Sequence, residues 1–220
     1  MRVLLALSFA LASFALAAEP EPAAFGNRLE AAQADYQASR LDAALTQLNQ
    51  HDKARGTSGD SLDLRGSIAL EQGKLEEAAK SFDEAHKLQP ELFAPRLHRA
   101  DLLLREKKFS DAAAAYEQLV RETNILTSNE RVRYGLLVAS LAQHNREGAE
   151  RALENIKFPT ETPAYYFAHA VAEFAQGHER PAQKWIATAR QIFRPELFSW
   201  FARPLYDLGW LKDKPSPPTI

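Results

Sequence analysis

Apolar and small residues in the middle of the chain recur at the spacing of two short helices joined by a tight turn. The first helix of this unit starts near Gly59 and ends at Gly73, because glycine readily adopts the left-handed conformation that closes a helix. The second covers about Leu75 to Leu88 and is stopped by Pro90, which cannot continue a helix. Small residues are expected where the two helices approach closely, and large apolar residues between them: Gly66, Ala78 and Ala85, and Leu62, Leu75 and Phe82.

The same pattern repeats along the chain with a period of 34 residues. Ala78 is matched by Ala112 and Phe82 by Tyr116, and a Gln-Gly turn occurs at both 72–73 and 176–177. The register slips after Arg121, where a few extra residues replace the stopping proline. The period predicts five helix pairs, over residues 25–58, 59–92, 93–126, 130–162 and 163–196.

This Leu…Gly…Ala…Phe…Ala…Pro pattern resembles the tetratricopeptide repeat (TPR), a helix–turn–helix unit of 34 residues. The resemblance implies an all-α fold, a right-handed α-solenoid of about five TPR-like helix–turn–helix repeats with a C-terminal capping helix. In such arrays the first helix of each pair lines a concave groove that holds a peptide or a helix of another protein. The implied role is a non-catalytic scaffold that binds a protein or peptide partner.

The composition supports a helical chain and excludes several functions. The 220 residues include 38 Ala and 29 Leu but only 5 Val and 6 Ile, which favours helices over strands. A net charge of −2 gives no basic surface for nucleic acid. The absence of cysteine excludes disulfides, thiol catalysis and thiolate metal sites.

The first eighteen residues have the pattern of a signal peptide. A positive start at Arg2 precedes an apolar run that closes on the small residues Ala17-Ala18, before a short linker over residues 19–24. A retained membrane anchor is the alternative. Because the chain has neither cysteine nor an N-x-S/T site, we expect export to a bacterial periplasm, or secretion, with no membrane span left after cleavage.

Residues 197–211 form the densest aromatic segment of the chain and precede a loose tail over 212–220. A solenoid end exposes an apolar face that an atypical terminal element has to cover. We therefore expect a capping helix, kinked or broken near Pro204. The alternative is that its aromatic side chains dock a partner.

The repeat register also predicts which residues face the groove. They are expected to be polar and acidic near its N-terminal end and apolar near its C-terminal end: Asp63, Ser67, Glu71, Leu97, Asp101, Leu104, Arg105, Tyr134, Val138, Leu141, Phe167, Val171 and Phe174. Family members that grip a carboxylate use Lys and Asn at slots where this chain has Asp63, Ser67, His98 and Gly135, so that partner class is disfavoured. The apolar half could hold an amphipathic helix of a partner, or the chain's own aromatic helix.

Candidate chemistry is limited to one group of residues. No nucleotide-binding or hydrolase motif occurs, so no enzyme and no cofactor are expected. His169 and Glu173 lie one helical turn apart, with His178 just beyond them, and could begin a metal or ligand site if a further ligand joined them. Self-association through the solenoid ends is a further possibility, and it would make the protein a structural component.

Overall fold

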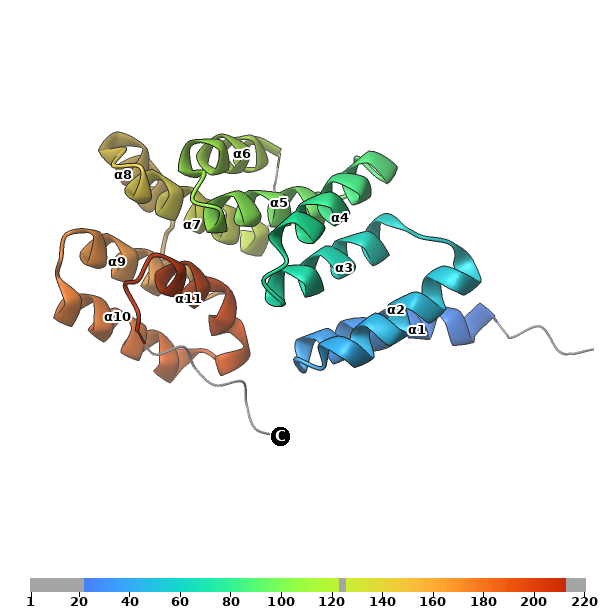
Figure 1. Cartoon of the computed structure of the whole chain (residues 1–220). Coiled ribbons are helices and arrows are strands. Elements are labelled where there is room, and N and C mark those ends of the chain that lie inside the picture. Colours follow the sequence, from blue (N-terminus) through green and yellow to red (C-terminus); the bar gives the residue numbers. More distant parts are fainter. Residues whose placement is uncertain (1–21, 123–125, 213–220) are drawn as a thin grey trace, which may run out of the picture.

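A computed structural model describes residues 22–122 and 126–212 of the chain. All regular structure in these residues is helical, with short turns between successive helices (Figure 1). The helices are α1 (Pro22–Gln37), α2 (Leu41–Arg55), α3 (Gly59–Glu71), α4 (Leu75–Leu88), α5 (Phe93–Arg105), α6 (Phe109–Glu122), α7 (Leu126–Ala142), α8 (Arg146–Glu154), α9 (Ala164–Ala175), α10 (Glu179–Ile192), the 3-10 turn η1 (Pro195–Leu197) and α11 (Phe198–Asp207). The all-α solenoid of helix pairs is therefore confirmed. The predicted signal segment 1–18 lies outside the described residues, as do most of the tail and the first part of the linker.

A residue in the left-handed conformation closes the first helix of every pair. Gly73 and Gly177 have φ values of +77° and +80°, and Ser39, Lys107 and His144 adopt φ near +60° at the equivalent positions. The spacing is 34 residues from Ser39 to Gly73 and again from Gly73 to Lys107, then 37 to His144 and 33 to Gly177. The structure thus shows the predicted period and its slip after the third pair, where α7 is longer than α3 and α5.

Small residues bring the helices of a pair into close contact, as the pattern predicts. A Cβ added to Gly66 on α3 would stand 2.6 Å from the ring of Phe82 on its pair partner α4. Between successive pairs, one on Gly135 of α7 would stand 2.4 Å from the ring of Tyr116 on α6. The repeated alanines of the second helices are all buried: Ala44, Ala78, Ala112, Ala149 and Ala182. Their burial explains why alanine is so abundant, since a larger side chain at these positions would separate the helices.

The structure differs from the expectation at two prolines, Pro22 at the start of α1 and Pro204 inside α11. α1 begins at Pro22, inside the predicted linker, because a helix accepts proline in its first turn, where no N–H partner is needed. α11 continues through Pro204 and is not broken there. Phe201 before the proline and Leu205 after it are both buried, so the helix is packed on both sides of Pro204. Among the described residues no helix combines the length and the apolar character needed to cross a bilayer.

Figure 1 shows the pairs from α1–α2 to α9–α10 following one another around an arch, with α11 on its inner side. The contacts agree, because α11 packs against α5, α7 and α9, the first helices of three successive pairs. The segment that was expected to cap the solenoid end therefore also enters the concave side of the array.

Candidate partner-binding groove

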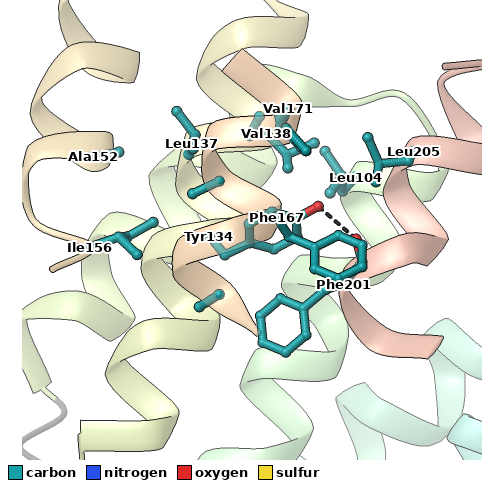
Figure 2. Close-up of a cluster of buried hydrophobic side chains, with 14 of the residues drawn as sticks. Leu104, Tyr134, Leu137, Val138, Ala152, Ile156, Phe167, Val171, Phe201 and Leu205 are labelled. Atoms are coloured by element: carbon teal, nitrogen blue, oxygen red, sulfur yellow. Dashed lines mark hydrogen bonds between the residues drawn. The ribbon is translucent and has the colours of Figure 1, made fainter. Parts of the chain in front are cut away.

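The inner faces of α3, α5, α7 and α9 form a concave groove, and α11 lies in it. Tyr134 on α7 and Phe167 on α9 provide the aromatic floor of its apolar half, shown in Figure 2. The ring of Phe201 lies 5.2 Å from the ring of Tyr134 and 5.9 Å from that of Phe167, measured between centroids. Phe201 and Leu205 are buried in this contact, so one face of α11 is part of the core.

A buried hydrogen bond fixes α11 along this floor. The Tyr134 hydroxyl donates to the backbone carbonyl of Phe201 over 2.6 Å, the dashed line in Figure 2. Just beyond the C-terminal end of α11, Trp210 stacks on Phe174 with a centroid distance of 6.3 Å and an interplanar angle of 11°. The apolar half of the groove is thus filled along its length by aromatic side chains and a satisfied polar group.

The other half of the groove is polar, and it holds α11 through charges. Arg203 of α11 pairs with Glu71 at the end of α3. Asp207 of α11 lies 3.7 Å from the Nε of Arg105 on α5, measured from its carboxylate oxygen. The Arg105 guanidinium also donates to the Leu70 carbonyl over 2.8 Å, which ties α5 to α3 at this point.

A second set of polar side chains lies beneath Trp200 of α11. The Arg131 guanidinium stacks on the Trp200 ring and also pairs with Asp101, at 3.3 Å. The Tyr116 hydroxyl donates to the other Asp101 oxygen over 2.5 Å. Arg131 therefore connects an aromatic ring of α11 to a carboxylate inside the solenoid.

Burial shifts the pKa values of this set. Removal from water raises the pKa of Asp101, although neighbouring Arg131 acts to lower it. Burial lowers the pKa of Arg131 to about 10, against the opposing effect of Asp101. Tyr36 on α1 belongs to the same region, and burial together with Glu71 raises the pKa of its hydroxyl to about 12.

A serine, a histidine and an aspartate also meet in the polar half, without forming a catalytic relay. His98 Nδ1 lies 2.8 Å from Asp63 Oδ1 and 3.5 Å from Ser67 Oγ. In a hydrolytic triad the acid and the nucleophile contact different nitrogens of the ring, whereas both contacts here involve Nδ1. The His98 ring packs between Phe82 and Trp200 at 5.5 and 6.3 Å, which makes it part of the interface with α11.

Comparison with known proteins agrees with this geometry. Residues 59–92, the pair α3–α4, match the family model of the tetratricopeptide repeat. The fold is a tetratricopeptide-repeat solenoid. No curated protein sequence matches the chain.

Solved TPR structures superpose on most of the chain at low sequence identity. A thermophilic TPR protein of Thermus thermophilus has a TM-score of 0.65 at 18% identity, covering 84% of this chain and 98% of its own. PilF of Pseudomonas aeruginosa has a TM-score of 0.63 at 14% identity, covering 84% and 86%. MamA of Desulfovibrio magneticus RS-1 has a TM-score of 0.57 at 17% identity, covering 76% and 94%. At such identities the likeness concerns the fold only.

Most of the predicted apolar groove residues are buried, and Tyr134, Phe167 and Phe174 are in ring contact with Phe201 or Trp210. The following are buried: Leu97, Leu104, Tyr134, Val138, Phe167, Val171 and Phe174. Leu141 is half-buried against the same cluster. Of the two arrangements left open by the sequence, this structure has the aromatic helix inside the groove. A partner role for these residues stays a prediction and requires α11 to leave or the partner to bind above it.

The polar groove residues form the network described above. Asp63 and Ser67 meet His98, whereas Asp101 and Arg105 reach Arg131 and Asp207. Arg131, Tyr116 and Arg203 belong to this network but were not among the predicted groove residues. Arg131 lies three residues before Tyr134 on a first helix, so the repeat register could have placed it on the same face.

The candidate metal ligands separate in the structure. His178 Nδ1 lies 2.9 Å from a Glu173 carboxylate oxygen in a partly exposed pair. His169 instead stacks on Trp185, with a centroid distance of 4.6 Å and an interplanar angle of 18°, and burial lowers its pKa. Within residues 22–122 and 126–212, no group of three potential metal ligands occurs, here or elsewhere.

Proposed function

We propose that this protein is an exported, non-catalytic scaffold that binds a partner protein on the concave side of its TPR solenoid. The observation that carries the proposal is that the concave groove already holds a helix. It does so with an aromatic floor, a buried hydrogen bond to the helix backbone, and ion pairs of both signs at its polar end. These are the contacts by which a groove recognises an amphipathic helix of another chain.

Export is part of the proposal and rests on the signal-like residues 1–18. It implies that the mature chain starts at Glu19 and is found outside the cytoplasm. Intact mass measurement of the protein from fractionated cells tests this point. A mature mass without residues 1–18 in the periplasmic or secreted fraction is expected, and a full-length chain confined to the cytoplasm would contradict export.

Site-specific photocrosslinking in the native envelope tests the binding surface. A photoreactive amino acid at Glu71, which is exposed at the polar end of the groove, should crosslink a defined protein partner. The matched control carries the same amino acid at Lys80, which is exposed on the second helix α4. A partner crosslinked at Glu71 and not at Lys80 supports the groove. Equal yields at both positions, or none at either, would refute it.

A further inference from the structure

We infer that α11 is a displaceable occupant of the groove and that its side-chain pattern describes the partner helix that replaces it. The inference rests on the proposed function, since it concerns the regulation and partner chemistry of the same groove. The partner helix would carry aromatic or aliphatic residues at the places of Phe198, Phe201 and Leu205. It would carry a basic residue at the place of Arg203 and an acidic residue four positions later.

The apolar spacing comes from the residues of α11 that meet the floor. Phe198, Phe201 and Leu205 are separated by three and four residues, so they lie along one face of the helix. Phe198 and Phe201 both contact the ring of Phe167, at 5.7 and 5.9 Å between centroids. Any helix with this spacing and similar side chains can use the same floor.

The charges define the direction in which such a helix lies. Glu71 on α3 receives the basic residue and Arg105 on α5 receives the acidic one, and both pairs lie at the edge of the groove. A helix inserted in the opposite direction would bring like charges together, which is unfavourable. The groove therefore selects one orientation as well as one apolar pattern.

The junction between α10 and α11 allows displacement without unfolding of the solenoid. A short connection through η1 links the two helices. Phe201 and Leu205 belong to the same continuous core as α5–α10, but each first helix also packs against the second helix of its own pair, and these contacts do not involve α11. Leaving the groove would expose the aromatic floor, so the equilibrium strongly favours the occupied state until a competing helix is present. The apparent affinity for that helix is then reduced in proportion to the small fraction of open groove.

A peptide with the sequence of residues 195–211, added to the full-length protein, tests this competition. In the variant Arg203→Glu the tethered α11 meets Glu71 with a like charge, whereas the added peptide keeps its arginine. We expect the labelled peptide to bind this variant at least about tenfold more tightly than the unmodified protein, measured by fluorescence anisotropy.

Two further variants separate displacement from simple loss of stability. In Glu71→Arg combined with Arg203→Glu the tethered pair is restored with reversed signs, and the peptide arginine now meets an arginine. The affinity of this double variant for the peptide should return to the level of the unmodified protein or below. The control Arg190→Glu, at an exposed position of α10, should leave the affinity unchanged. If Arg203→Glu fails to fold, judged by circular dichroism, Arg203→Gln gives the same test with a smaller expected gain.

The failure of this inference differs from that of the proposed function. If the peptide binds Arg203→Glu no more tightly than the unmodified protein, α11 is a permanent part of the core and the inference is overturned. A partner still crosslinked at Glu71 would then show that binding takes place above α11, and the proposed function would stand. If no partner is crosslinked, the proposed function fails, whatever the peptide does.

Discussion

At the scale of single residues, one backbone conformation recurs through the repeats. The residue that closes each first helix has a positive φ, and it is glycine in two pairs and a residue with a side chain in three. The sequence predicted this conformation at Gly73 and Gly177, because glycine signals it. It could not identify Lys107 or His144 in the same way, since their side chains give no such signal and only the period points to them.

Lys107→Gly should stabilise the protein. Lys107 holds φ near +60°, a conformation that costs an L-residue about 1–2 kcal/mol and glycine almost nothing. The greater freedom of glycine in the unfolded chain offsets about 0.5–1 kcal/mol, so a net gain of roughly 0.5–1 kcal/mol is expected in urea unfolding. The neighbouring change Lys108→Gly serves as the control and should destabilise, because Lys108 lacks a positive φ. Equal effects of the two changes would show that the turn conformation does not limit stability.

At the scale of helices, the sequence predicts those elements whose limits are set by nearby residues, and it predicts less well those placed by distant contacts. The limits of α4, Leu75 to Leu88, follow from a glycine turn before it and a proline after it, and the structure shows the same limits. The position of α11 depends instead on competition between capping the solenoid end and filling the groove. That competition is decided by contacts with residues a hundred or more positions earlier, such as Arg203 with Glu71, which no local pattern encodes.

Three tyrosine hydroxyl groups inside the array are expected to make the protein less stable at alkaline pH. The pKa of Tyr36 is about 12 in the folded protein, against 10 for an exposed tyrosine, and those of Tyr116 and Tyr134 are also raised, chiefly by burial. The pKa of each of these tyrosines is higher in the folded chain than in the unfolded chain. Their contribution to the free energy of unfolding is therefore fully present below pH 10 and is lost as the pH rises. The lowered pKa of Arg131 acts in the opposite sense above pH 10 and weakens the trend.

Tyr36→Phe isolates one of these hydroxyls. Between pH 10 and about 12, the free energy of unfolding of the unmodified protein should fall relative to that of the variant, by up to about 1.4 kcal/mol per pH unit. Chemical unfolding at several pH values measures this difference, with the same comparison at neutral pH as the reference. A difference that stays constant with pH would mean that Tyr36 ionises equally in the folded and unfolded chains.

At the scale of the whole molecule, α11 packs inside the arch of five helix pairs. The period explains the arch, and the long-range pairs of α11 explain why the groove is filled. That Tyr134, Phe167 and Phe174 lie on one side of the array was predictable, because repeat register carries over from pair to pair. Their burial was not, since it depends on where the aromatic segment lies. Their role in binding a partner stays a prediction. The central proposal for the entire chain is therefore that a partner and α11 use the same groove.

Covalent locking of α11 tests this claim most directly, and the absence of cysteine from the chain makes the chemistry specific. Glu71→Cys combined with Arg203→Cys places two thiols at a contact between α3 and α11. A short bis-methanethiosulfonate crosslinker, which a reductant cleaves, holds α11 in the groove. The measurement is the amount of envelope partner captured by the same protein before and after cleavage. We expect little capture while the link is intact and recovery after reduction, whereas equal capture in both states would show that the partner and α11 do not share the groove.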